Sequence, residues 1–425
     1  MPKLPVQRIA DLRLEPGELS FEARLAGVEP QRMWFRSETE VTPSADAALA
    51  ACLLPAMRQG GSLEIDEPIS PRLLKNQREY QAIQRVWSYD WAYGEAPLEE
   101  VEVAAPSQSP APQPPTGRVG AFFSGGVDSF ATILSNPDVT DLVFIRGVDI
   151  LPRLAHQEGL ADRVETRLHE AAAELGKPLH VIETNIRDLS DPLVRWECYF
   201  SAPLLAVAHF FAPLFDRVLI TGDADHETQP LMGTALLVDH LWSSEKLEIE
   251  DFGGRLSRHQ RVGMVAEHPV VRGTLRTCWE NPEGAYNCGR CRKCLQTMLS
   301  LELHGARQGV ETFPPELDLD LLEGFELNQT ISLVIWEDLL AAIREAGRSD
   351  LEPAVAAFVE KGRQTMGLAK TYRSRPSRDG VPETLSGVER EALEAELATV
   401  LESRSWRLTE PLRRLGAKLR SRRGR

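Results

Sequence analysis

The stretch Phe123-Ser124-Gly125-Gly126-Val127-Asp128-Ser129 lies between a short apolar run, residues 119–123, and a run of helical character, residues 130–134. This order predicts a buried strand, a glycine turn and a helix, which together direct free backbone N–H groups at an anion such as phosphate. The two glycines accept positive φ and let the backbone approach the anion closely. The two serines add hydroxyl donors. Asp128 fits beside phosphate when a cation lies between them, which indicates Mg²⁺.

From residue 118 onward the chain alternates between strand-like and helical runs. Strands are predicted at Val119–Phe123, Asp141–Ile145, Leu179–Glu183 and Arg217–Thr221, with helices between them at about 130–135, 155–175 and 192–211. Alternation of this kind predicts an α/β fold with a parallel, doubly wound sheet. Ligands bind such sheets at the carboxyl ends of the strands, so the expected site comprises the loops at 124–129, 146–150, 184–190 and 222–230.

The loop after the fourth predicted strand carries Asp223, Asp225, His226 and Glu227. These side chains suit metal ligands or acid–base groups, and they suit equally well a polar loop with helix-capping carboxylates.

Four of the six cysteines form the pattern Cys278-x9-Cys288-x2-Cys291-x2-Cys294. Four thiolates at this spacing can bind one tetrahedral Zn²⁺, and an iron–sulfur cluster is the alternative. A closed four-cysteine zinc site is structural, because it leaves no position open for substrate. Cysteines gathered in this way in a large chain favour a metal over disulfides and indicate a reducing cytoplasm.

Composition is that of an ordinary soluble protein, with 42% hydrophobic and 26% charged residues in 425. The length is enough for two or three domains. A net charge of −15 argues against nucleic acid as the main partner, because phosphate neutralisation dominates such binding. The apolar runs are too short for a membrane span, and the N-terminus lacks a signal sequence, so a cytoplasmic location is expected.

The glycine loop and the cysteine pattern together carry a resemblance. The loop resembles the SGGxDS loop of the ATP pyrophosphatases, and its order with the four cysteines over residues 118–300 resembles the 7-cyano-7-deazaguanine synthase family. The resemblance implies that Ser124, Gly125, Gly126, Val127, Asp128 and Ser129 bind ATP with Mg²⁺, that Asp128 and Ser129 are catalytic, and that the four cysteines hold Zn²⁺. Gly147, after the second strand, is then expected near the adenosine.

Two departures bear on the substrate. The family's Pro-x-Arg-Asn corresponds to Cys198-Tyr199-Phe200-Ser201-Ala202, and its Tyr-Pro-Asp-Cys-Arg is replaced by residues 225–230. Both strings face the deazapurine in the family. Activation by ATP is therefore better supported than the identity of the acceptor.

The sequence divides into five segments. Residues 1–101 are predicted to form a small α+β domain, in which a helix from Ala45 ends before Pro55. A Pro-rich linker, 102–117, precedes the nucleotide-binding domain, 118–300. A helical region, 301–385, follows. The tail, 386–425, ends in a basic amphipathic helix suited to a membrane surface or a protein partner, or in a solvated terminus.

These observations predict an ATP-dependent ligase that adenylates a carboxylate, releases pyrophosphate and transfers the acyl group to ammonia or an amine. The carboxylate belongs to a small molecule or a protein, and an oligomer is compatible with the sequence. The alternatives are a sugar amidotransferase of the same superfamily, an RNA sulfur transferase and a non-catalytic nucleotide sensor. A sulfur transferase needs a reactive thiol, and Cys198 is the candidate in the core.

Overall fold

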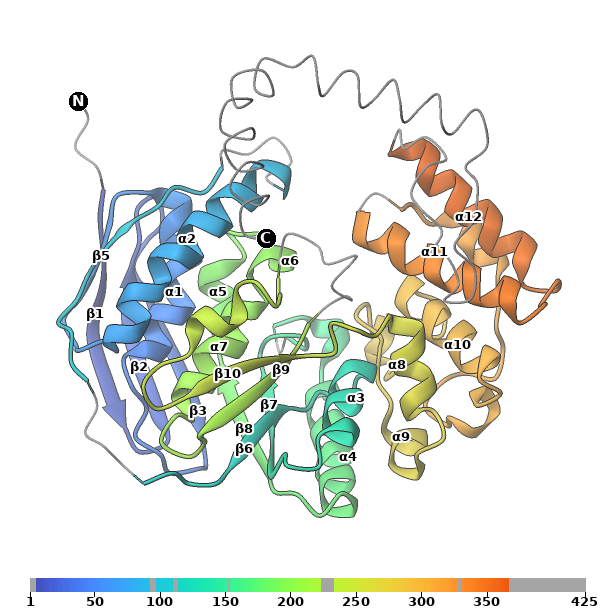
Figure 1. Cartoon of the computed structure of the whole chain (residues 1–425), viewed down its shortest axis with the longest axis horizontal. Coiled ribbons are helices and arrows are strands. Elements are labelled where there is room, and N and C mark those ends of the chain that lie inside the picture. The colour runs from blue at the N-terminus through green and yellow to red at the C-terminus, as the bar shows by residue number, and fades with distance from the viewer. Residues whose placement is uncertain are drawn as a thin grey trace, which may run out of the picture. The chain divides into compact units, whose positions relative to one another are not determined.

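The computed structural model describes residues 5–91, 97–109, 114–151, 153–222, 233–327 and 330–366. They form an α/β structure around a ten-stranded sheet with the order β10-β9-β6-β7-β8-β3-β2-β1-β4-β5 (Figure 1). The strands are β1 Val6–Glu15, β2 Glu18–Arg24, β3 Gln31–Ser37, β4 Ser62–Ile65, β5 Glu102–Ala104, β6 Val119–Phe122, β7 Asp141–Arg146, β8 Leu179–Thr184, β9 Arg217–Thr221 and β10 Glu248–Phe252. The helices are α1 Asp46–Gln59, α2 Pro71–Trp91, α3 Val127–Ser135, α4 Leu160–Glu174, α5 Ile186–Ser190, α6 Trp196–Tyr199, α7 Ser201–Phe210, α8 Arg258–Val265, α9 Pro269–Thr274, α10 Arg292–Leu303, α11 Thr330–Glu345 and α12 Glu352–Thr365.

Five strands, β10, β9, β6, β7 and β8, form a parallel block. The four strands predicted from the sequence all belong to it, so the α/β prediction is confirmed. Helices cover both faces of this block. Successive side chains of β7 point to opposite faces of the sheet, and each face packs against a different set of helices. Leu142 and Phe144 pack into a core with α3 and α4, whereas Val143 and Ile145 pack into the core that contains α1 and α7.

The N-terminal segment extends the same sheet. Strand β3 pairs antiparallel with β8, and Thr184 faces Phe35 in the register. The contact continues beyond the ladder, because the Asn185 side chain accepts from the backbone N–H of Trp34 at 2.9 Å and donates to the carbonyl oxygen of Arg32 at 2.9 Å. The sheet is therefore continuous across the boundary predicted between residues 101 and 118, and one compact unit runs from Met1 to Ala369.

The start of the predicted linker belongs to the sheet edge. Strand β5 pairs parallel with β4, and Ser107 forms a further bridge with Ile69. An edge strand tolerates the prolines that follow, because one side of its backbone needs no partner. The Asp216 carboxylate then accepts from the backbone N–H groups of Thr116 and Gly117, at 2.9 and 2.7 Å, just before β6 begins.

Helix α1 does not end at Pro55, as the sequence predicted, but continues to Gln59. Proline has no N–H to give to the carbonyl of the residue four positions earlier, here Ala51. The phenol of Tyr199 supplies the missing donor, at 2.7 Å from the Ala51 oxygen. The helix passes through the proline because a residue from α6 satisfies its free carbonyl.

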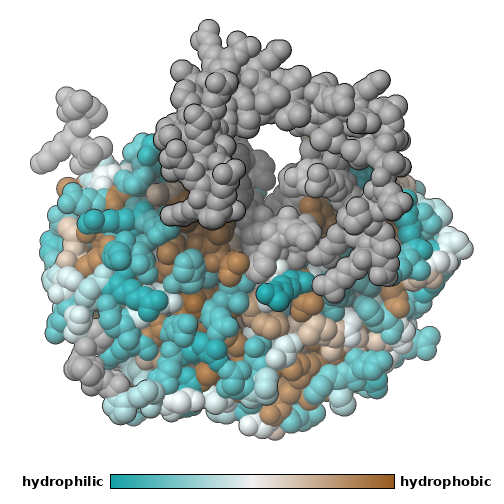
Figure 2. Space-filling view, viewed as in Figure 1, coloured by the Kyte–Doolittle hydropathy of each residue, from teal (hydrophilic) through white to brown (hydrophobic). Residues whose placement is uncertain are grey.

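The C-terminal part of the described chain packs a third core between α10, α11 and α12, with Trp336 buried in it. Within the region predicted to be helical, a short 3₁₀ turn, Asp320–Gly324, precedes α11. Within the described ranges, no helix combines the length and the apolar character needed to cross a membrane. Polar residues cover most of the face seen in Figure 2, with smaller apolar areas between them. The predicted tail lies outside the described residues.

Candidate functional site

The glycine loop leaves β6 and enters α3, as predicted. Gly125 has a φ of 73°, and Gly126 is the N-cap of α3 in an extended conformation. The loop is held by its neighbours, because the backbone N–H of Arg276 donates to the Gly125 carbonyl at 2.8 Å. Within the described residues, no hydrogen bond engages the backbone N–H groups of Gly126, Val127 and Asp128. These donors are available at a helix N-terminus, which favours an anion there.

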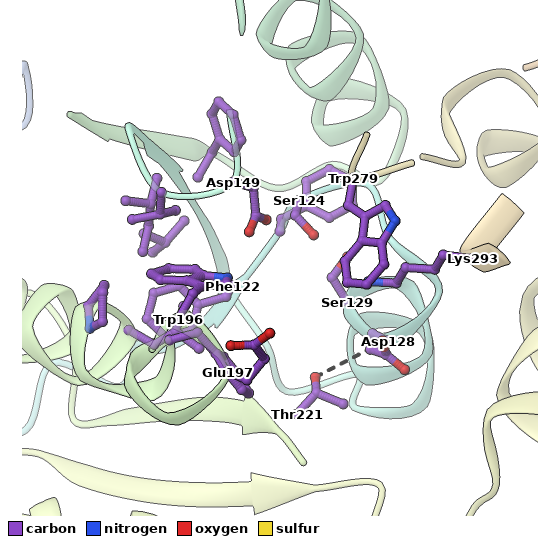
Figure 3. A pocket seen from close by; sticks show the side chains of 18 residues that line it. Phe122, Ser124, Asp128, Ser129, Asp149, Trp196, Glu197, Thr221, Trp279 and Lys293 are labelled. Carbon is purple, nitrogen blue, oxygen red and sulfur yellow. Dashed lines mark hydrogen bonds between the residues drawn. The ribbon is translucent and has the colours of Figure 1, made fainter. Parts of the chain in front are cut away.

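Two adjoining cavities meet at this loop. The apolar cavity, of about 360 Å³, is lined mainly by side chains of β6, β7 and α7 and by Trp196 and Phe200. The polar cavity, of about 390 Å³, is lined by Arg187, Arg258 and Arg276 together with Gly126 and Gln157. The residues that line both cavities are Ser124, Asp128, Ser129, Asp149, Trp196, Trp279 and Lys293. In Figure 3, Trp196 and Trp279 lie on opposite sides of the apolar cavity, and Lys293 reaches toward it from the side of Trp279.

Asp128 is paired with two arginines from α8. Its carboxylate contacts Arg258 and accepts a hydrogen bond from Nη1 of Arg261 at 2.9 Å. Arg261 is fully buried and also donates to the carbonyls of Gly222, at 2.8 Å, and Gly253, at 2.9 Å. Burial opposes ionisation of Asp128, but the two guanidinium groups outweigh it and hold the pKa of the carboxyl well below its usual range. Asp128 is therefore an anion that orients cations at the loop.

A second carboxylate borders this pair. Burial raises the pKa of Asp251, at the end of β10, to about 6, and the charge of Arg261 partly offsets the effect. Arg261 thus interacts with acidic groups from α3 and β10.

The side chain of Arg187 stacks on the indole ring of Trp196. The guanidinium lies 3.8 Å from the centre of the indole ring, within cation–π range. Arg187 is fixed in turn by a 2.5 Å ion pair with Asp191 and by a 2.8 Å hydrogen bond to the Val148 carbonyl. The indole is therefore positioned as one wall of the apolar cavity before any ligand enters.

The predicted loop residues do not all face the cavities. Ser124, Gly126, Asp128 and Ser129 line at least one of them, whereas Val127 is buried in the core between α3 and α4. Gly125 supplies the turn.

Gly147 is not among the cavity-lining residues; Val148 and Asp149 after it are. A Cβ at Gly147 would lie 2.1 Å from the Thr184 carbonyl oxygen, and its φ is 86°. Packing against β8 therefore accounts for this glycine.

The four cysteines converge as the spacing predicted. Their Sγ atoms all lie within 4.8 Å of one another, and the pairs Cys278–Cys291 and Cys288–Cys294 are each 3.9 Å apart. Four sulfurs bound to a single ion at about 2.3 Å would lie close to these separations. In an iron–sulfur cluster the four cysteines are divided among two or four irons, which spreads their sulfurs farther apart than around a single ion. The cluster can hold one metal ion such as zinc.

Backbone donors surround these sulfurs. The N–H of Cys291 donates to Sγ of Cys288 at 3.2 Å, and the N–H of Asn281 donates to Sγ of Cys278 at 3.3 Å. Hydrogen bonds with the neighbouring thiols, Cys278 first, hold the pKa of Cys288 well below its ordinary value, whereas hydrogen bonds within the same cluster raise the pKa of Cys291 and Cys294. Without a metal the thiols therefore share protons, and a bound ion would take up the charge of four thiolates.

The segment that carries the four cysteines also supplies side chains that line both cavities, Trp279 and Lys293. Trp279 follows Cys278, and Lys293 stands between Cys291 and Cys294 at the start of α10. Sequence reasoning missed both side chains, although their positions inside the cysteine pattern could have pointed to them. It also missed the role of Arg258 and Arg261, which lie in a polar stretch, 257–261, ahead of the cysteines. The predicted acidic loop, 223–230, lies outside the described residues.

Comparison with known protein families, with curated proteins and with solved structures found no match to this chain.

Proposed function

We propose that the chain is an ATP-dependent ligase that activates a carboxylate as an acyl adenylate and transfers it to a nitrogen nucleophile. The single observation that carries the proposal is the position of the glycine loop between an apolar and a polar cavity. A nucleotide needs an apolar slot for its base and cationic donors for its phosphates. Here the slot has Trp196 as one wall, and the donors are the loop N–H groups, Lys293 and Arg258.

In the proposed reaction, a carboxylate oxygen attacks the α-phosphorus of ATP, and the bond to the bridging oxygen of pyrophosphate breaks. Ammonia or an amine then attacks the acyl carbon, loses a proton and displaces AMP. The loop N–H groups and cationic side chains stabilise negative charge that develops on the phosphates, which is the main catalytic contribution expected of such a site. Ser124 lines both cavities and would donate a hydroxyl hydrogen bond to the nucleotide. The Ser129 hydroxyl donates to the Gly126 carbonyl at 3.0 Å and would donate to the nucleotide only after giving up that bond, and Asp128 holds Arg258 in position.

Mg²⁺ is part of the proposal. Asp128 and Asp149 both line the cavities and offer carboxylate oxygens, the ligand type that Mg²⁺ takes. The ion would supply charge neutralisation of the phosphates. Because Arg258 and Arg261 already occupy the Asp128 carboxylate, the protein itself provides part of the positive charge there.

We assign zinc to the four-cysteine cluster. Four thiolates leave no open coordination position, so its contribution is to hold the loop that carries Trp279 and the start of α10 with Lys293. The neighbouring charges fit this role, because Arg292 stacks 5.8 Å from the Trp279 ring and offsets thiolate charge.

Isotope exchange between ATP and pyrophosphate tests the proposal. The purified full chain is incubated with ATP, Mg²⁺, labelled pyrophosphate and a panel of carboxylates that includes 7-carboxy-7-deazaguanine. Exchange that depends on a carboxylate supports adenylation. ATP binding without exchange across a broad panel indicates a nucleotide sensor instead.

The burial of Cys198 bears on the alternative that the chain is an RNA sulfur transferase. Its side chain is 2% exposed, and it is not among the residues that line either cavity, although Trp196, Glu197 and Phe200 beside it are. Buried thiols are generally unreactive, so the position of Cys198 favours the ligase over a sulfur transferase.

A further inference from the structure

We propose that Arg276 and Thr277 form a subsite for an anionic oxygen group, either a phosphate of the nucleotide or the carboxylate of the acceptor. The inference deepens the proposed function. It rests on that function in one respect, because it takes the polar cavity to be the place where the ligand binds. Both residues line that cavity, immediately before Cys278.

Arg276 is a buried cation without a counter-ion among the described residues. Its side chain is 6% exposed, and the structure shows one hydrogen bond from its guanidinium, a 3.3 Å contact of Nη2 with Oδ1 of Asn281. No acidic residue of the described chain forms an ion pair with it. Buried charges are costly and are normally paired, so an unpaired guanidinium beside a cavity indicates that its partner is a ligand.

The other arginines of the polar cavity differ from it in this respect. Arg258 is paired with Asp128, and Arg187 is paired with Asp191. Each of these two therefore has an acidic partner within the protein, whereas Arg276 has none among the described residues. Of the three arginines, Arg276 is the one whose neutralisation depends most on what enters the cavity.

Thr277 provides a second, independent observation. Its side chain is 5% exposed, and its hydroxyl oxygen is buried without a hydrogen-bond partner in the structure. Nε of Arg276 is likewise buried without a partner. Two adjacent side chains with unsatisfied polar atoms, both lining one cavity, are an arrangement that a bound oxyanion completes.

The backbone links this subsite to the glycine loop. The N–H of Arg276 donates to the Gly125 carbonyl, and the N–H of Thr277 donates to Oδ1 of Asn287 at 2.8 Å. An anion held by these two side chains would share the polar cavity with the free N–H groups of the loop. Both possible ligands, phosphate and carboxylate, present the same charged oxygen chemistry to a guanidinium.

Calorimetric titration of the full chain tests the proposal, with inorganic pyrophosphate, ATP, adenosine and 7-carboxy-7-deazaguanine as probes at fixed ionic strength. Arg276→Gln removes the charge and Thr277→Val removes the hydroxyl. We expect Arg276→Gln to weaken at least one anionic probe by about tenfold or more, and Thr277→Val to weaken the same probe by about threefold. Adenosine, which carries no anion, should bind both variants as it binds the parent.

The pattern identifies the source of the anion. Loss of pyrophosphate and ATP affinity identifies phosphate, and loss of affinity for the carboxylate alone identifies the acceptor. Arg255→Gln is the matched control, because Arg255 is exposed and does not line either cavity. Metal content and thermal midpoint show whether each variant is folded, and Arg276→Lys, which keeps the charge, should retain part of the affinity.

Unchanged affinity of folded Arg276→Gln for all three anionic probes overturns the proposal. The result is separable from the proposed ligase activity. A parent protein that shows no ATP–pyrophosphate exchange but binds pyrophosphate through Arg276 would refute the ligase and keep the subsite. If Arg276→Gln keeps both the ATP–pyrophosphate exchange and the ligand affinities of the parent, the subsite is refuted and the ligase proposal stands.

Discussion

Replacement of Tyr199 by Phe tests how α1 passes through Pro55. The change removes only the phenol oxygen, which donates at 2.7 Å to the Ala51 carbonyl, and keeps the ring in place. Both residues are fully buried, so no water can replace the lost donor. A buried carbonyl left without a partner costs about 1–3 kcal/mol, and we expect the variant to lose that much free energy of unfolding.

Combining Tyr199→Phe with Pro55→Ala tests whether the cost arises from the missing N–H of Pro55. Pro55→Ala restores an N–H at position 55, which can donate to the Ala51 carbonyl as in a regular helix. In that background Tyr199→Phe should cost about 1 kcal/mol less than in the parent, because the carbonyl keeps a partner. Urea denaturation followed by circular dichroism gives the unfolding midpoint of each variant. The midpoints can be compared when the unfolding free energies of the variants depend on urea concentration with the same slope.

Two outcomes refute this account. One is an equal cost of Tyr199→Phe in both backgrounds, and the other is a cost no larger than that of Tyr89→Phe, an exposed control expected to change stability by less than about 0.5 kcal/mol. The result matters for the site, because Tyr199 ends α6, which carries Trp196 and Glu197 into the apolar cavity.

Three further predictions concern the site, the metal and pH. Asp128→Asn should abolish ATP–pyrophosphate exchange without unfolding the chain, because the charge that orients Arg258 is lost; exchange and thermal midpoint are measured together. Cys291→Ser should lose the bound metal and lower solubility, as measured by metal analysis and by the soluble fraction. The third concerns His259, whose pKa burial lowers from 6.5 to about 4, aided by the charge of His304. Because the unfolded chain then binds more protons between these values, stability should fall as pH drops from about 6.5 to 4, and less so in His259→Gln.

Each of these predictions has a result that contradicts it. Exchange within a few-fold of the parent in Asp128→Asn would remove that residue from the site. Several irons per chain together with acid-labile sulfide would replace zinc by an iron–sulfur cluster, and a metal-free parent would remove the centre altogether. An identical pH profile of His259→Gln and the parent would show that other groups carry the acid sensitivity.

The sequence by itself determined the features that depend on residues close together in the chain. The strand, glycine turn and helix around Gly125 follow from local pattern, and so do the four strands of the parallel block. The cysteine spacing determined that four thiols can reach one ion, because three of them lie within seven residues, Cys288 to Cys294. Local backbone preferences and short-range ligand spacing are readable without knowledge of the fold.

The tertiary structure decided everything that rests on pairs distant in sequence. The pairing of β3 with β8 joined the N-terminal strands to the parallel block, and Tyr199 let α1 continue through Pro55 although 144 residues separate them. Asp128 meets Arg258 and Arg261 only because α8 packs beside α3. Arg276 became a candidate anion ligand only when its burial and its lack of an acidic partner could be seen together. Charge pairing and burial depend on which distant side chains the fold brings together, and no local pattern records them.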